Sequence, residues 1–203
     1  VILVLLSGFY AYYHYNGLQF DRYYGRTIQH YNQHQWPHTL TAAEKALAYR
    51  QNQNDLLYFY IGYARNMMGD TRESIASYHR LLEHFPNYLN ALINLGVAYG
   101  KTGLPEKAAA MYEQVVNILP DRFEYYNDIG HYSLQTGNLE QAYAYFTKAA
   151  ALNENNATIQ LNLGVVCLQM KQFDRAEQFF KNALALAPEW ERPKQFLDLI
   201  ESR

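Results

Sequence analysis

Apolar and small residues recur with a fixed period along most of the chain. Glycines stand 34 residues apart at Gly62, Gly96, Gly130 and Gly164, each directly after a large aliphatic residue. A small residue lies twelve positions after each glycine, and an aromatic residue lies four positions further on. These residues are Ser74, Ala108, Ala142 and Ala176, followed by Tyr78, Tyr112, Phe146 and Phe180. Spacings of three and four residues predict one apolar helical face, so the period predicts stacked helical units.

A second set of signals divides each unit into two helices. Glycine recurs seven positions after the first glycine, at Gly69, Gly103 and Gly137, and Lys171 takes this position in the last unit. Glycine there predicts a left-handed residue that ends the first helix. Acidic residues then suit the positive start of the second helix, and prolines close three of the units. Each unit is therefore predicted to be a helix–turn–helix.

Residues 55–190 resemble four repeats of the tetratricopeptide (TPR) family, with units at 55–88, 89–122, 123–156 and 157–190. The period, the glycines and the small and aromatic positions carry the resemblance. The tryptophan of the family is replaced by Tyr58, Leu92, Tyr126 and Gln160. The resemblance implies an all-α fold, a right-handed superhelical solenoid of helix-turn-helix repeats.

Two flanking segments extend this pattern. Residues 21–54 are predicted to be a degenerate TPR-like helical pair, with helices over 23–34 and 39–49. Residues 191–203 form an amphipathic pattern that predicts a C-terminal capping helix, because the end of a repeat stack needs a cover.

The first 20 residues are the most apolar part of the chain. The run from Val1 to Tyr13 holds no charge and is shorter than the roughly 20 apolar residues that a spanning helix needs. We therefore expect the end of a longer membrane anchor, with Tyr10, Tyr12, Tyr13 and Tyr15 at the lipid–water interface. The alternative is an ordinary helix that packs on the repeats. Sparse positive charge after the run favours an exported, periplasmic location for the repeats.

Composition excludes several classes of function. The formal net charge of −2 and the pI near 6.4 leave no basic surface for nucleic acid. Cys167 is the single cysteine, which removes intrachain disulfides and multi-cysteine metal sites. His30, His34 and His38 lack a completing ligand nearby, so they are interpreted as surface residues. No nucleophile–base pair or phosphate loop is present in the sequence, so we expect no enzyme, no metal and no cofactor.

The resemblance implies that the first helix of each repeat lines a concave groove that binds partner proteins. The predicted partner-binding residues are Phe59, Tyr60, Tyr63, Met67, Asn90, Asn94, Lys101, Glu124, Asn127, Asp128, His131, Asn162 and Gln169. The lysine and arginine positions with which TPR proteins clamp acidic chaperone tails hold Phe59, Glu124 and Asp128 instead. Of the two asparagine positions of that clamp, one holds Tyr63 and only Asn94 is kept. Binding of such tails is therefore not expected, and the asparagines are predicted to bind an extended peptide backbone.

The resulting hypothesis is a membrane-tethered scaffold or adaptor that helps to assemble a multiprotein membrane complex. An alternative is the C-terminal TPR region of a larger polytopic membrane enzyme, such as an O-antigen ligase or polymerase-like protein. A third possibility is a soluble module. The sequence does not name the partner, because TPR function lies in surface chemistry rather than in the fold.

Overall fold

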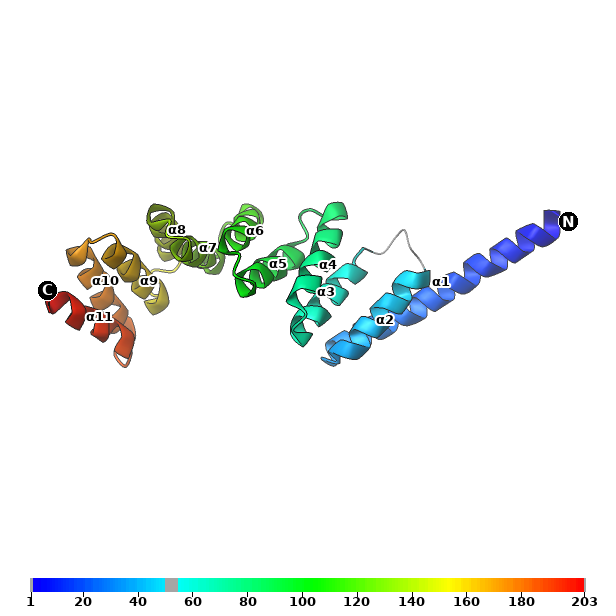
Figure 1. The fold of residues 1–203 in the computed structure, drawn as a ribbon, viewed down its shortest axis with the longest axis horizontal. Helices are drawn as coiled ribbons and strands as arrows, with labels where there is room; N and C mark the ends of the chain where they lie inside the picture. Colours follow the sequence, from blue (N-terminus) through cyan, green and yellow to red (C-terminus); the bar gives the residue numbers. More distant parts are fainter. Residues whose placement is uncertain (1, 50–54, 203) are drawn as a thin grey trace. The chain divides into compact units, whose positions relative to one another are not determined.

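The computed structural model describes residues 2–49 and 55–202, with side chains described for residues 10, 12–49 and 55–202. The described residues form eleven α-helices and no strand (Figure 1). The chain divides into two compact units, one ending at Thr102 and the other beginning at Gly103. They are called here the first unit and the second unit.

The first unit contains five helices in chain order. They are α1 (Ile2–Asn32), α2 (Trp36–Tyr49), α3 (Leu57–Met68), α4 (Thr71–His84) and α5 (Leu89–Lys101). Each helix packs on the next one, and α2 lies along the C-terminal part of α1 (Figure 1). Phe20, Ala43, Ala46, Leu57 and Ile61 form a buried cluster that joins α1, α2 and α3.

The second unit contains six helices. They are α6 (Pro105–Ile118), α7 (Phe123–Gln135), α8 (Leu139–Leu152), α9 (Ala157–Gln169), α10 (Phe173–Leu186) and α11 (Glu191–Glu201). Phe146 of α8 and Leu163 of α9 share one buried cluster. Phe196 of α11 stacks on Phe180 of α10 with 4.9 Å between ring centroids, so α11 covers the apolar face of α10.

The first helix of three pairs passes very close to the second. A Cβ atom at Gly62 would lie 2.8 Å from the ring of Tyr78, and one at Gly164 would lie 2.5 Å from the ring of Phe180. Gly130 meets Phe146 in the same way, at 2.7 Å. These rings are fully buried, so they have no room to move away. Three glycines of the 34-residue period therefore lie where the paired helices come closest to each other.

The turns between paired helices share one backbone geometry. Gly69 and Gly137 have φ values of 94° and 76°, which end α3 and α7 in the left-handed region. Lys171 adopts the same conformation with φ of 60°, although it carries a side chain. Its N–H donates to the Leu168 carbonyl, and the Gln172 N–H donates to the Cys167 carbonyl. The last turn thus keeps the repeat geometry without the glycine.

The N-terminal helix has different bounds from those expected. Instead of an apolar helix over residues 1–20 followed by a separate one over 23–34, α1 runs without a break from Ile2 to Asn32. Glycine weakens a helix by only about 1 kcal/mol, and the first proline is Pro37, so nothing ends the helix earlier. In addition, no helix of the described residues is long and apolar enough to cross a membrane. The side chains of residues 1–9 and 11, which carry most of the apolar run, lie outside the described residues.

We expect Gly62→Ala to destabilise the first unit by roughly 1–3 kcal/mol, because the added methyl group would overlap the buried Tyr78 ring. Gly25→Ala is the matched control, since nothing lies within 4 Å of a Cβ at Gly25. In α1 this control should gain up to about 1 kcal/mol from helix propensity. Urea unfolding monitored by circular dichroism measures both changes, and equal effects would contradict the close-approach explanation.

We expect Lys171→Gly to stabilise the second unit by roughly 0.5–1 kcal/mol, because glycine adopts the left-handed conformation without the cost that a Cβ brings. The reverse exchange, Gly137→Lys, should destabilise by roughly 1–2 kcal/mol. Thermal unfolding of the two variants and the wild type measures both stability changes. A lower Tm for Lys171→Gly would show that the lysine side chain contributes more than its backbone strain costs.

Candidate functional site

An aromatic surface lies on the first unit, formed by Tyr31, Trp36, Tyr60 and Tyr63. Tyr31, near the end of α1, is central: its ring centroid lies 5.1 Å from those of both Tyr60 and Tyr63. Trp36 at the start of α2 lies 5.9 Å from Tyr31 and 5.4 Å from Tyr63. Most of these pairs are edge-to-face, a favourable arrangement for aromatic rings. Three helices therefore contribute to one surface.

The tyrosine hydroxyls of this surface are left without internal partners. All four side chains are half-buried, and the Tyr31, Tyr60 and Tyr63 hydroxyls make no hydrogen bond to another described residue. Burial raises the pKa values of Tyr31 and Tyr60, and neighbouring tyrosines such as Tyr88 add to the rise. The Tyr31 and Tyr60 hydroxyls therefore stay protonated and able to donate a hydrogen bond.

The structure separates the predicted aromatic residues into two kinds. Phe59 is only 8% exposed and packs against Tyr78 and Tyr88, so its role is in the core. Tyr60 and Tyr63 remain accessible, and Met67 is 49% exposed one turn beyond Tyr63. Sequence reasoning missed Tyr31 and Trp36. Both lie in the degenerate segment, whose register was not mapped.

The predicted residues of α5 are polar and accessible. Asn90 and Lys101 are exposed, and Asn94 is half-buried. The Lys101 Nζ atom donates to the Asn66 Oδ1 atom of α3 at 3.2 Å. One polar pair thus links the exposed ends of these two helices.

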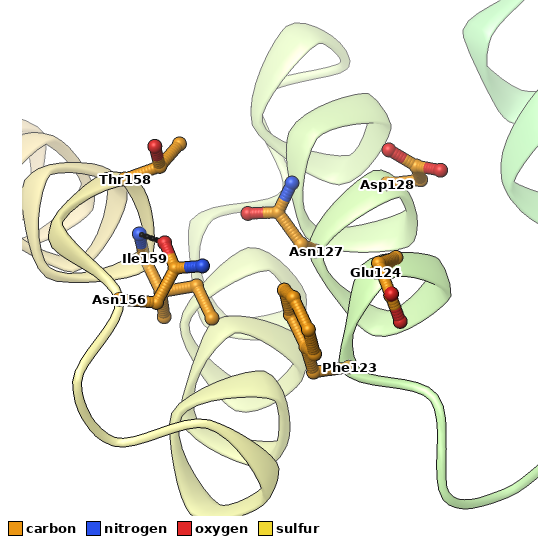
Figure 2. Close-up of a pocket in the computed structure, with 7 residues that line it drawn as sticks. All are labelled: Phe123, Glu124, Asn127, Asp128, Asn156, Thr158 and Ile159. Carbon is orange, nitrogen blue, oxygen red and sulfur yellow. Dashed lines mark hydrogen bonds between the residues drawn. The ribbon is translucent and has the colours of Figure 1, made fainter.

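A pocket of about 230 Å³ lies between α7 and α9 in the second unit (Figure 2). Three predicted residues line it: Glu124, Asn127 and Asp128. The other lining residues are Phe123, Asn156, Thr158 and Ile159. Figure 2 shows the α7 residues on one side and Asn156, Thr158 and Ile159 on the other. The segment before α9 was not predicted as part of a site, because it was interpreted only as a repeat boundary.

Carboxamides connect the two sides of this region. The Asn162 Nδ2 atom donates to the Asn127 Oδ1 atom at 2.9 Å, which leaves the Asn127 amino group free to donate. The Asn156 side chain accepts a hydrogen bond from the Ile159 N–H at 3.2 Å and caps α9. His131 and Gln135 pair with each other at 2.8 Å on the exposed face of α7, and Gln169 is exposed on α9.

The two carboxylates of the pocket have different surroundings. Glu124 forms a bidentate ion pair with Arg122 at 3.1 and 3.2 Å, and the pKa of Glu124 is lowered by these hydrogen bonds. Asp128 has no hydrogen bond or ion pair with any described residue. Burial raises the pKa of Asp128 to about 6, and the charge of Glu124 adds to the rise. Asp128 is thus a half-buried, unpaired anion at neutral pH.

The comparisons identify the family. A tetratricopeptide repeat model matches residues 66–128 and 133–200. This chain belongs to the tetratricopeptide repeat family. The recognition made from the 34-residue period is therefore confirmed, and no curated protein matches the chain by sequence.

Solved TPR structures resemble this chain over most of its length. MamA is 25% identical, with a TM-score of 0.70 over 74% of this chain and 82% of MamA. YrrB, described as a TPR protein with an unusual peptide-binding site, is 15% identical, with a TM-score of 0.78 over 89% of this chain and 91% of YrrB. A TPR protein from Parabacteroides merdae is 17% identical, with a TM-score of 0.78 over 91% of this chain and 73% of its own. The latter two show the fold alone.

We expect Asp128→Asn to stabilise the second unit near pH 7.5 by roughly 1–3 kcal/mol and to have little effect near pH 4. The pKa of Asp128 is higher in the folded chain, at about 6, than its ordinary value of 3.8. The folded state therefore binds the proton of Asp128 more tightly than the unfolded state does. The loss of folding stability caused by the ionised Asp128 carboxylate is absent at low pH and complete above about pH 6.

Urea unfolding of the wild type and the variant at both pH values measures the difference. Asp121→Asn removes the same charge from an exposed residue and should change stability by less than about 0.5 kcal/mol. A stability gain for Asp128→Asn that is equal at both pH values would contradict the ionisation argument.

Proposed function

We propose that this TPR chain is a non-catalytic scaffold that binds segments of partner proteins on the first-helix faces of its repeats. The aromatic surface of the first unit carries the proposal. Aromatic side chains that keep an apolar body and an unpaired hydroxyl are typical of the residues that contribute most to protein interfaces. A partner backbone can supply the missing acceptors for Tyr31, Tyr60 and Tyr63.

The fold supports this function. TPR repeats stack on their neighbours and present extended binding surfaces. YrrB, which shares the fold, is described as having a peptide-binding site. For this chain, an extended segment is a suitable ligand, since Asn127 of α7 and Asn162 of α9 place half-buried carboxamides on successive first helices of the second unit.

The chemistry of the surfaces narrows the choice of partner. The positions that would need cations for an acidic chaperone tail hold the buried Phe59 and the acidic residues Glu124 and Asp128. A partner with apolar or aromatic anchors suits the first unit. An acidic tail would be repelled by the second unit.

The location of the scaffold stays a prediction from the sequence. The membrane-tethered adaptor requires a spanning segment, which the described residues do not contain. The same requirement holds for the alternative, a TPR region of a larger polytopic enzyme. Placement on the exported side of a membrane, and a role in assembling a membrane complex, rest on the charge and aromatic pattern of the first helix.

Site-specific photo-crosslinking in cells tests the binding surface. With p-benzoylphenylalanine in place of Tyr63 or Met67, we expect crosslinking to the same partner, because both side chains lie on one face of α3. Met68 is the matched control: it is 41% exposed but lies about 100° further round the helix. The crosslinked partner is identified by mass spectrometry.

Truncation of the surface should then weaken binding of that partner. We expect Tyr63→Ala to lower affinity by roughly tenfold or more, as removal of an interface aromatic does, and Met68→Ala to leave it unchanged. Equal crosslinking from all three positions, or an unchanged affinity for Tyr63→Ala, would exclude this surface as the binding site.

A further inference from the structure

The pocket between α7 and α9 differs in chemistry from the aromatic surface. It combines one unpaired carboxylate, Asp128, with the carboxamides of Asn127 and Asn156 and the apolar side chains of Phe123 and Ile159. From this combination we infer that the pocket binds the cationic side chain of an arginine or lysine in an extended partner segment. The inference rests on the proposed scaffold function and names one feature of the ligand.

Charge complementarity is the first argument. Arg122 is the nearest cation of the α7 start, and both Oε atoms of Glu124 already accept hydrogen bonds from it. Asp128 keeps its negative charge and lacks an ion pair with any described residue. An unpaired half-buried carboxylate costs free energy in the folded chain. A cation from a ligand would remove that cost.

The shape and polarity of the pocket supply the second argument. A volume of about 230 Å³ accommodates one long side chain. The apolar walls formed by Phe123 and Ile159 suit the methylene stem of arginine or lysine, which keeps its charged end near polar groups. Asn127 retains a free amino group after its bond with Asn162, so it can donate to a peptide carbonyl beside the bound side chain.

A free metal ion is a poorer ligand for this site. Divalent cations of the calcium and magnesium type require six or more oxygen ligands. Among the described residues, no group of three His, Cys, Asp or Glu side chains has metal-binding geometry. A guanidinium or ammonium group needs only the single carboxylate and neighbouring carbonyl oxygens that are present here.

The test uses the full chain and two small probes of almost equal shape. Nα-acetyl-arginine N-methylamide carries the cation, and the citrulline analogue replaces it with a neutral urea. In NMR titrations, the side-chain amides of Asn127, Asn156 and Asn162 report binding. We expect saturable shifts with the arginine probe and at least about tenfold weaker binding of the citrulline probe, since a charge-assisted hydrogen bond is lost.

Asp128→Asn should abolish this preference for the cation. The side chain keeps its size, so the variant folds with the same packing, and circular dichroism confirms this. Asp121→Asn changes the net charge equally at an exposed residue and should retain the preference. Equal binding of the two probes to the wild type, or equal effects of the two variants, would overturn the inference.

The pH dependence supplies an independent readout. Glu124, Arg122 and His131 of the α7 segment, Tyr132 of α7 and Tyr112 of α6 are the titratable groups around Asp128. Arginine-probe binding should strengthen roughly tenfold from about pH 5 to pH 7 as Asp128 loses its proton. In Asp128→Asn, this increase should be absent.

Failure of this inference is distinguishable from failure of the proposed function. If photo-crosslinking at Tyr63 captures a partner but the pocket shows no preference for the cation, the scaffold stands and only the cationic ligand is excluded. If the pocket prefers the cation while Tyr63 and Met67 capture nothing, the aromatic surface is excluded instead.

Discussion

The contact between a glycine of one helix and an aromatic ring of the next is the constraint on which three of the helix pairs depend. In the pairs α3–α4, α7–α8 and α9–α10, the glycine leaves room for Tyr78, Phe146 or Phe180 to lie against the backbone. The ring is then fully buried, and the paired helices approach closely along the apolar face. With this distance fixed, the outward side of the first helix needs no apolar residues for packing. Its residues are free to carry binding chemistry.

The two units use that freedom differently. In the first unit, rings from α1, α2 and α3 pack edge-to-face on one another, and the hydroxyls of Tyr31, Tyr60 and Tyr63 make no hydrogen bond to another described residue. The second unit has a polar surface in which carboxamides pair between α7 and α9 beside an isolated carboxylate. Apolar anchoring is favoured by desolvation, whereas charge recognition depends on pH and salt. On the two proposals made here, one scaffold carries two sites with different ligand preferences.

Asp128 shows how a stability cost can indicate function. A half-buried carboxylate without a partner is unfavourable, and an asparagine of the same size would fit the position. Tyr112 and Tyr132, whose rings stack on each other, lie near it and do not form a hydrogen bond with it. Packing alone gives no reason for the charge. A ligand that binds the folded state and pairs with the Asp128 carboxylate would be a reason for the charge.

The sequence by itself determined the family and the positions of the helices within the repeats. The 34-residue period reports helix pairing directly, because its glycine and aromatic positions meet in the pairs α3–α4, α7–α8 and α9–α10. It also located Tyr60, Tyr63, Asn127 and Asp128 on first helices, since position in the repeat sets the face of the helix. Lys171 showed that the turn geometry persists where the glycine signal is lost.

Only the tertiary structure decided which of those residues are accessible and what surrounds them. Phe59 and Tyr63 are four positions apart on one face of α3, yet the first is buried and the second accessible, because Tyr78 and Tyr88 pack around Phe59. Tyr31 joins the aromatic surface from a segment whose repeat pattern is degenerate, so no periodic signal marked it. The isolation of Asp128 depends on Arg122 pairing with Glu124 rather than with Asp128. Such choices between neighbours are made by distances in three dimensions, which a one-dimensional period does not contain.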